Sequence, residues 1–298
     1  MLKTIRIGTR DSQLALWQAH TVADLLHKQG CKTQIVKVKS QGDIILDKPL
    51  YELGITGVFT KNIDIALLNN EIDIAVHSMK DVPTQLAKGI VQTAVLERAS
   101  VYDMLVYKDT LDFLDQQYAL VATGSLRRKA QWLNKFPTHQ ITDLRGNINT
   151  RLQKLSDSNW NGAIFAQAGL ERIAVTPQNV MVLDWMIPAP SQGAIMVVAR
   201  ADDDYCVSET SKINHSDTAV CTYVEKDFLR ELEGGCTAPI GALAKINNEQ
   251  IDFVGVLLSV DGTKKIEVRK SVSRAEYKQL GADAARQVKA QLDFEIGK

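Results

Sequence analysis

Apolar residues in the first two hundred positions alternate between short runs typical of buried strands and longer stretches with helical spacing. Ser12 can cap a helix with apolar positions such as Leu14, Trp17 and Val22, and Gly30 ends it. The pattern predicts strands over 4–8, 35–38, 72–76, 90–96, 104–107, 120–122, 140–142, 163–165 and 180–183. It predicts further helices over 61–68, 126–134 and 148–156. Such alternation indicates doubly wound α/β sheets with helices on both faces.

The pattern changes after residue 214. A helix is predicted over 216–232, and a final amphipathic helix near the C-terminus. Between them, strands are predicted over 241–246, 251–260 and 264–270. Strands that follow one another in this way indicate a smaller C-terminal α+β domain built on an antiparallel sheet.

Composition narrows the class of protein. A chain of 298 residues suits two or three domains. The formal net charge is zero, so no global charge attracts the chain to nucleic acid or to a membrane. The longest apolar runs, such as 194–199, are too short to cross a bilayer, and the N-terminus lacks the apolar core of a signal peptide.

The cysteines argue against two kinds of site. All four lie far apart in the sequence and form no C-x-x-C pair, which disfavours a zinc site and a disulfide framework and favours a reducing cytoplasm. Cys236 differs from the other three because Gly234 and Gly235 precede it and Pro239 follows it. These neighbours cannot continue a helix or a central strand, so we expect the thiol to be displayed on a tight loop.

Positive charge is concentrated between residues 125 and 151, a segment that contains six basic residues and one acidic residue. The basic residues follow predicted strands and begin predicted helices, where backbone N–H groups favour anions. Guanidinium groups add forked donors that match carboxylates. The alternative is a solvated helix face with ordinary surface arginines. The residues concerned are Ser125, Arg127, Arg128, Arg145, Gly146 and Arg151.

Two further groups follow predicted strands. Lys80 and Asp81 come directly after the strand over 72–76, where Asp81 could stabilise a cation or move a proton; the alternative is a turn residue before a proline. Arg10 and Ser12 follow the first strand and could hold a carboxylate, although Ser12 could also be a plain N-cap. No histidine spacing suits a metal, and no glycine-rich nucleotide loop is present, so neither a metal nor a nucleotide cofactor is predicted.

Several long runs, in order along nearly the full length, resemble the porphobilinogen deaminase family, also called hydroxymethylbilane synthases. The runs are RIGTRDSQLALWQA from Arg6, DIAVHSMKDVP from Asp73, GSLRR from Gly124, LRGN from Leu144, PAPSQGA from Pro188 and LEGGC from Leu232.

The resemblance implies a transferase of tetrapyrrole (haem) biosynthesis. Members join four porphobilinogen molecules head-to-tail, with loss of ammonia, to give hydroxymethylbilane. A dipyrromethane cofactor primes the chain, and the resemblance places it on Cys236 through a thioether. Asp81 matches the catalytic carboxylate, which would assist loss of ammonia and stabilise the azafulvene cation.

The resemblance also assigns the binding residues, which would hold the acetate and propionate groups of the pyrroles. The residues implied for cofactor binding are Cys236, Lys80, Asp81, Ser125, Arg127, Arg128, Arg145 and Gly146. The residues implied for substrate binding are Arg10, Ser12, Phe59, Arg145, Arg151, Arg172 and Gln192.

The family's fold matches the pattern above: two lobes resembling periplasmic binding proteins and a C-terminal domain that carries the cysteine loop. It implies a first domain over 1–97 with 196–213, a second over 98–195 and a third over 214–298. It further implies a cytoplasmic monomer that binds neither nucleic acid nor membrane.

The chain departs from the family in the expected lid, where Thr56 replaces a lysine and Asn62 an acid, while Phe59 is retained. We expect slower or differently gated elongation from this change. Gly124 stands where the family usually has serine. Two other functions compete: a non-catalytic binding protein for small polyanions, and nucleic-acid binding through the basic segment, which the lack of interleaved aromatic residues disfavours.

Overall fold

The structure is a computed structural model and describes residues 3–39, 59–232 and 238–293. The described chain separates into two compact units. The first unit contains residues 3–39, 59–99 and 193–220, and the second contains residues 100–192, 221–232 and 238–293. The predicted division into three domains stays a prediction.

The first unit is a five-stranded sheet with the strand order β2-β1-β3-β10-β4. β1 pairs in parallel with β2 and β3, whereas β10 runs antiparallel to both of its neighbours. The strands are β1 (Thr4–Thr9), β2 (Lys32–Lys37), β3 (Ile74–Ser78), β4 (Ile90–Val95) and β10 (Ile195–Arg200). Its helices are α1 (Gln13–Lys28), α3 (Lys61–Leu68), α7 (Asp204–Ser211) and the 3-10 turn η2 (Met79–Asp81).

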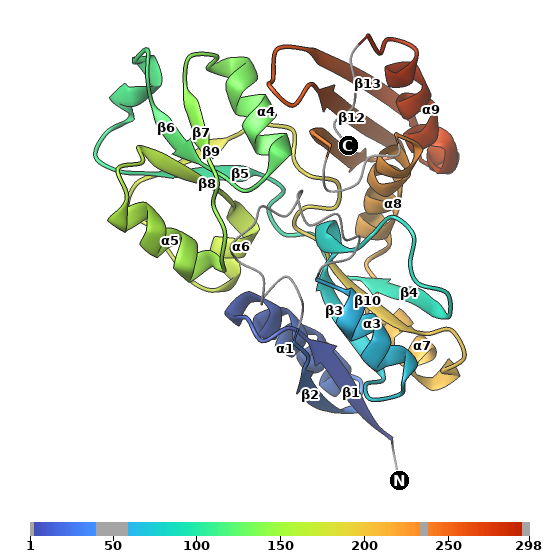
Figure 1. The fold of residues 1–298 in the computed structure, drawn as a ribbon. Coiled ribbons are helices and arrows are strands. Elements are labelled where there is room, and N and C mark those ends of the chain that lie inside the picture. Colours follow the sequence, from blue (N-terminus) through green and yellow to red (C-terminus); the bar gives the residue numbers. More distant parts are fainter. Residues whose placement is uncertain (1–2, 40–58, 233–237, 294–298) are drawn as a thin grey trace. The chain divides into compact units, whose positions relative to one another are not determined.

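Both faces of this sheet are covered because alternate residues of its central strands are apolar on each side. Ile74 and Val76 of β3 pack with α1 and with Cys206 of α7 on one face. Ala75 of β3 and Met196 of β10 pack with α3 on the other face. Figure 1 shows α1 and α3 beside the strands of this sheet. The predicted α/β class with helices on both faces is therefore confirmed for this unit.

The second unit contains another five-stranded sheet, in the order β7-β6-β8-β5-β9. β6 is parallel to β7 and β8, while β5 is antiparallel to β8 and β9. The strands are β5 (Asp103–Tyr107), β6 (Leu120–Ala122), β7 (Gln140–Thr142), β8 (Gly162–Ala166) and β9 (Val180–Leu183). Its helices are η3 (Leu111–Asp115), α4 (Leu126–Lys135), α5 (Ile148–Asp157) and α6 (Gln167–Arg172). α4 packs on one face around Trp132, and α5 and α6 pack on the other around Leu155 and Leu170.

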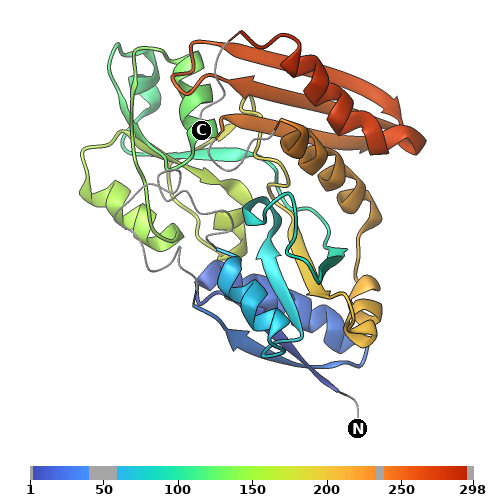
Figure 2. The ribbon, with the colours of Figure 1, turned by 45° about the vertical axis from the view of Figure 1, so that its right-hand side comes forward.

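The second unit also contains the predicted antiparallel C-terminal sheet, in the order β11-β12-β13 (Figure 2). The elements here are α8 (Ser216–Glu231), β11 (Ile240–Asn247), β12 (Gln250–Leu258), β13 (Lys265–Ser273), η4 (Arg274–Glu276) and α9 (Tyr277–Lys289). Phe228 of α8 packs edge-to-face on Phe253 of β12. Val256 and Leu258 of β12 join Ala130 of α4 and Ile187 in one core cluster, which fixes this sheet to the rest of the unit.

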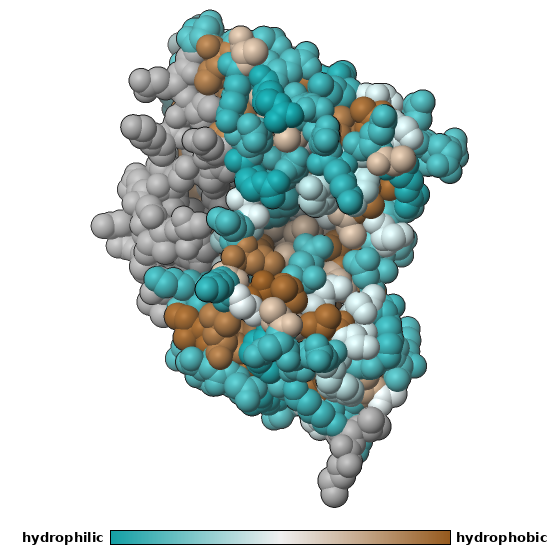
Figure 3. Space-filling model, turned by 90° about the vertical axis from the view of Figure 1, so that its right-hand side faces the viewer, coloured by the Kyte–Doolittle hydropathy of each residue, from teal (hydrophilic) through white to brown (hydrophobic). Residues whose placement is uncertain are grey.

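Every predicted strand overlaps an observed strand, but the strand β10 and the two short helices α6 and α7 were not predicted. Figure 3 shows one face of the surface, where hydrophilic residues predominate and apolar residues gather in separate patches. Within the part of the chain that is described, no helix combines the length and the hydropathy needed to span a membrane.

Candidate functional site

In the first unit, predicted site residues meet at the carboxyl ends of two neighbouring parallel strands. β1 leads into Arg10 and Ser12, and β3 leads into the turn η2 that holds Lys80 and Asp81. Carboxyl ends of parallel strands lie on one edge of a sheet, where ligands of open α/β folds bind.

A cavity of about 70 Å³ lies at this edge, and we call it the Asp81 cavity. Among the described residues that line it, Asp81 carries the only carboxylate. The guanidinium carbon of Arg10 lies 4.1 Å from the centre of the Phe59 ring, a cation–π contact that orients the arginine. The lining residues are Arg10, Ser12, Leu14, Ala15, Gln18, Phe59, Thr60, Val76, His77, Ser78 and Asp81.

Ser12 is the N-cap of α1, which confirms the structural alternative considered for this residue. Its hydroxyl accepts a hydrogen bond from the Ala15 backbone N–H at 3.3 Å and so caps α1. The same hydroxyl lines the Asp81 cavity, so capping does not exclude a second role in binding.

Gln18 and His77 line the Asp81 cavity, although the sequence analysis gave neither a role. Gln18 is buried, and its Nε2 donates to the Ser78 hydroxyl at 2.8 Å. His77 is 6% exposed, and its Nε2 has no hydrogen-bond partner within the described part of the chain. Burial, together with the charge of Arg10, lowers the pKa of His77 to about 4, so the imidazole is neutral at pH 7. The His77 imidazole therefore adds no positive charge near Arg10.

The second unit contains the predicted basic residues at the starts of its helices. The Ser125 hydroxyl accepts from the Arg128 backbone N–H at 3.5 Å and caps α4, which follows β6. The Asn147 side chain accepts from the Thr150 backbone N–H at 2.9 Å and caps α5, which follows β7. Both helices therefore begin shortly after a strand of the sheet ends, as predicted.

Gly146 and Gly124 allow these loops to form. Gly146 has a φ of 112°, and a Cβ there would lie 2.8 Å from the Thr150 side chain. A Cβ at Gly124 would lie 2.5 Å from the carbonyl oxygen of Leu144. The serine usual in the family at position 124 would therefore require this chain to move the Leu144 backbone.

The arginines of the second unit are more buried than a surface cluster would be. Arg145 is 8% exposed, and burial lowers its pKa. Burial likewise lowers the pKa of Arg172 to about 10. Arg151 donates from Nε to the carbonyl of Gly146 at 2.8 Å. Because burial costs each cation hydration, an anion nearby would stabilise it.

Arg127 and Arg128 are buried and share a carboxylate that sequence reasoning did not single out. Arg127 Nη1 lies 2.6 Å from Asp103 Oδ2, and Arg128 Nε lies 2.9 Å from Asp103 Oδ1. Gln192 Nε2 donates to the same Oδ1 at 2.9 Å. Three predicted binding residues therefore converge on Asp103. An isolated acid at the start of a strand gives no local signal of this role.

Some predictions concern residues outside the described ranges. Cys236 and Thr56 are among them. The three described cysteines, Cys31, Cys206 and Cys221, are buried. Of the lid departures, Asn62 is described, and its Nδ2 donates to the Lys39 carbonyl at 2.8 Å. A search of the described residues finds no group of His, Cys, Asp or Glu able to hold a metal ion.

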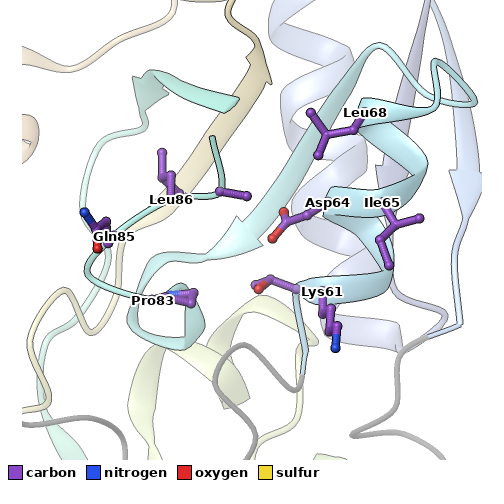
Figure 4. Close-up of a pocket in the computed structure, with 9 residues that line it drawn as sticks. Lys61, Asp64, Ile65, Leu68, Pro83, Gln85 and Leu86 are labelled. Atoms are coloured by element: carbon purple, nitrogen blue, oxygen red, sulfur yellow. The ribbon is translucent and has the colours of Figure 1, made fainter. Parts of the chain in front are cut away.

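A second cavity in the first unit, of about 330 Å³, contains none of the predicted site residues (Figure 4). Thr60 lines both cavities. Figure 4 shows the Asp64 carboxylate directed from α3 toward the segment that carries Pro83 and Leu86. Burial raises the pKa of Asp64 to about 6, and a smaller opposing effect comes from a hydrogen bond with Thr60.

Comparison with solved structures gives low similarity. The methionine-binding protein MetQ superposes with a TM-score of 0.47 at 17% identity, over 75% of this chain and 94% of that chain.

Protein-family models and curated sequences both match this chain, and the matches point to one family. The family model described as "Porphobilinogen deaminase, dipyromethane cofactor binding domain" matches residues 5–208, and the one described as "Porphobilinogen deaminase, C-terminal domain" matches residues 219–290. Porphobilinogen deaminase of Syntrophomonas wolfei is 40% identical over 96% of this chain and 95% of its own length. The probable porphobilinogen deaminase of Methanocaldococcus jannaschii is 42% identical over 87% of this chain and 90% of its own length. The chain therefore belongs to the porphobilinogen deaminase family.

Proposed function

We propose that this chain is a hydroxymethylbilane synthase that joins four porphobilinogen molecules head-to-tail with loss of ammonia, and that Asp81 is its catalytic carboxylate. The observation that carries the activity is the match of both family models across 5–208 and 219–290, supported by relatives that share about 40% of their residues. The non-catalytic binding protein is disfavoured by the same match.

The surroundings of Asp81 support its proposed role. Among the described residues that line its small cavity, the other ionisable groups are Arg10 and the neutral His77. When ammonia leaves the aminomethyl group of porphobilinogen, positive charge develops on the substrate. A fixed carboxylate in a partly enclosed cavity stabilises such charge more strongly than water does. Arg10, oriented by Phe59, would hold a substrate carboxylate, with Ser12 as a further donor.

The arginines of the second unit suit the carboxylates of a dipyrromethane. Arg127 is buried, so a ligand carboxylate nearby would offset the hydration that its guanidinium has lost. The start of α4 at Ser125 adds backbone N–H groups, and Gly146 lets its loop approach closely. The dipyrromethane supplies, when bound, the terminal pyrrole carbon that primes the polymer. Its proposed holders are Lys80, Asp81, Ser125, Arg127, Arg128, Arg145 and Gly146, with Cys236 as the thioether anchor.

The remaining proposed substrate contacts are Arg151, Arg172 and Gln192, with Arg145 serving both ligands. Burial of Arg145 and Arg172 supports this, since a substrate acetate or propionate would offset their lost hydration.

The anchor is tested by the intact mass of the denatured protein. We expect the parent to be heavier than its sequence by two linked pyrrole units and Cys236→Ala to have its bare sequence mass. A parent that stays at bare mass after incubation with porphobilinogen would contradict the proposal and would favour a binding protein.

The catalytic carboxylate is tested by Asp81→Asn. We expect turnover to fall by about 10²–10³-fold, because a neutral amide cannot balance the developing cation. Asp11→Asn is the matched control: Asp11 lies in the neighbouring loop, is exposed and pairs with Lys37 at 2.8 Å. Equal turnover in Asp81→Asn and Asp11→Asn would remove Asp81 from the mechanism.

We also propose a cytoplasmic monomer that binds neither nucleic acid nor membrane. The zero net charge supports the lack of a global attraction to nucleic acid or to a membrane surface. Light scattering should give a mass near 33.0 kDa. Salt-dependent retention on DNA would contradict the second part of this proposal.

A further inference from the structure

A buried glutamine of α4 holds the backbone of a distant segment at two points. Gln131 is 5% exposed. Its Oε1 accepts from the Ile187 backbone N–H at 2.8 Å, and its Nε2 donates to the Ile187 carbonyl at 2.9 Å. A side-chain amide that bonds both backbone groups of one residue replaces the pair of bonds that a neighbouring strand would make. These two bonds fix the distance between Ile187 and α4.

The helix that carries Gln131 also carries arginines proposed to hold the dipyrromethane. Gln131 follows Arg127 by four positions, so the two side chains lie on the same side of α4, one turn apart. Arg127 Nη1 donates to the same carbonyl of Ile187 at 2.9 Å. The position of Ile187 is therefore set by the side of α4 that presents Arg127.

Ile187 and Pro188 also contact β11, the strand that follows Cys236 in the sequence. The Ala242 backbone N–H donates to the Pro188 carbonyl at 2.9 Å. At Gly241, a Cβ would lie 2.8 Å from the carbonyl oxygen of Ile187, so glycine is needed for this close approach. The segment held by α4 is thus the one on which β11 docks.

The free edge of β11 makes these contacts, because β11 is the edge strand of the C-terminal sheet. Further along this edge, the Ala244 backbone N–H donates to Glu225 Oε1 at 2.8 Å. The Ser191 backbone N–H donates to the other oxygen, Oε2, at 2.6 Å, so the buried Glu225 carboxylate ties β11 to the segment that follows Ile187. A shift of β11 along this segment would leave buried N–H groups unpaired, which is costly.

We propose that Gln131 is a positioning residue: through Ile187 it fixes the spacing between α4, which carries Arg127 and Arg128, and β11, which follows the cofactor anchor Cys236. The inference rests on the proposed function, because the spacing matters only if a ligand attached to Cys236 places its carboxylates at these arginines. An anchored ligand of fixed length depends on that spacing, and a displacement of about 1 Å can slow a reaction by on the order of 10²-fold.

Asn161 provides a matched control in the same unit. Its Oδ1 accepts from the Leu120 backbone N–H at 2.8 Å, so it is likewise a side-chain amide bonded to the backbone of a distant residue. Leu120 begins β6, whereas α4 follows the other end of that strand. Neither Asn161 nor Leu120 is a proposed site residue. Loss of the Asn161 amide should therefore lower stability without changing the spacing between α4 and β11.

The test measures cofactor loading of the full-length protein, prepared without cofactor. Gln131→Met and Asn161→Leu each replace an amide by an apolar side chain of similar size. Each variant is incubated with porphobilinogen below its unfolding temperature, and the rate of loading is followed by intact mass. Protection of the three described cysteines, all buried, from iodoacetamide shows that a variant is folded. We expect Gln131→Met to load about tenfold more slowly than the parent and Asn161→Leu to load at the parent's rate.

Gly241→Ala tests the same spacing from β11, and it decides the matter if Gln131→Met does not fold. The added methyl group would push β11 away from Ile187 while both bonds of Gln131 remain. We expect a similar slowing of loading. In the double variant, the two effects should combine to less than their product, because both act on the position of Ile187 against its neighbours.

Three results would overturn the inference. They are loading at the parent's rate in either folded single variant, equal slowing in Gln131→Met and Asn161→Leu, and effects of Gln131→Met and Gly241→Ala that simply multiply. A parent that does not load at all would contradict the proposed function instead, so the two failures are distinguishable.

Discussion

Asp73 in the first unit and Asp103 in the second are both almost fully buried, and each is surrounded by cations, but the exposure of those cations differs. Lys3 and Arg6 beside Asp73 are 43% and 33% exposed. Arg127 and Arg128 beside Asp103 are 5% and 7% exposed. Arg200, a third partner of Asp73, is 13% exposed. Water can therefore solvate Lys3 and Arg6 when the Asp73 carboxylate is removed, but it can do so far less for Arg127 and Arg128 when Asp103 is removed.

Cations keep both carboxylates charged despite their burial. Burial by itself would raise the pKa of both acids, but Arg6 and Lys3 hold the pKa of Asp73, and Arg127 and Arg128 that of Asp103, well below the usual range. Both therefore contribute stability that is present above about pH 4 and is lost as the pH falls toward the folded-state pKa. Arg127 and Arg128 beside Asp103 are almost fully buried, whereas Lys3 and Arg6 beside Asp73 are not.

The largest effect is expected for Asp103→Ala. The substitution removes the carboxylate that two buried guanidiniums share, so we expect the free energy of unfolding to fall by about 3–5 kcal/mol. Urea denaturation, with hydrogen exchange of the β5 amides to localise the loss to the second unit, measures it. A loss below about 1 kcal/mol would mean that water reaches Arg127 and Arg128 and would break the comparison.

Asp73→Ala should have a smaller effect. Lys3 and Arg6 can return to water, so we expect a loss of about 1–3 kcal/mol, the range for an unmade hydrogen bond at a partly solvated group. The same denaturation series applies, with hydrogen exchange followed in β3. If Asp73→Ala costs as much as Asp103→Ala, cation exposure does not distinguish the two clusters.

Asp64 sharpens the comparison because it is a partly buried carboxylate whose pKa is raised to about 6 rather than lowered. Its folded state holds the proton more tightly than the unfolded state, so stability falls as the pH rises from about 4 to 6. After allowance for solvent screening, Asp64→Asn should add about 1–2 kcal/mol at pH 8 and almost nothing at pH 4. Unfolding temperatures at the two pH values measure this. A gain that does not depend on pH would refute the electrostatic explanation.

The smallest effect concerns the two serine caps, one in each unit. Ser125→Ala removes the cap of α4 and should cost about 0.5–1 kcal/mol, since the bond to the Arg128 N–H is long at 3.5 Å. Ser12→Ala, with a bond of 3.3 Å on α1, is its counterpart. Denaturation compares both with the parent. A loss of several kcal/mol for Ser125→Ala would show that the cap, rather than Asp103, fixes Arg127 and Arg128.

Much of this protein could be predicted from local sequence. Apolar periodicity located every strand from β1 to β9 and the antiparallel C-terminal sheet, because alternation and helical spacing are properties of neighbouring residues. The cap at Ser12 was readable for the same reason. The motif runs around Arg10, Asp81 and Arg145 identified the family, which the family models confirmed.

The tertiary structure decided which side chains from distant parts of the chain form pairs. Asp103 is 24 positions from Arg127 and 89 from Gln192, and Gln18 is 60 from Ser78. Such pairs form only after the sheets assemble, so no local pattern marks them. The antiparallel placement of β10 between β3 and β4 has the same origin. The sequence determined the family and the elements, while long-range packing decided which charges are buried together, because burial and partnership depend on residues that are distant in the chain.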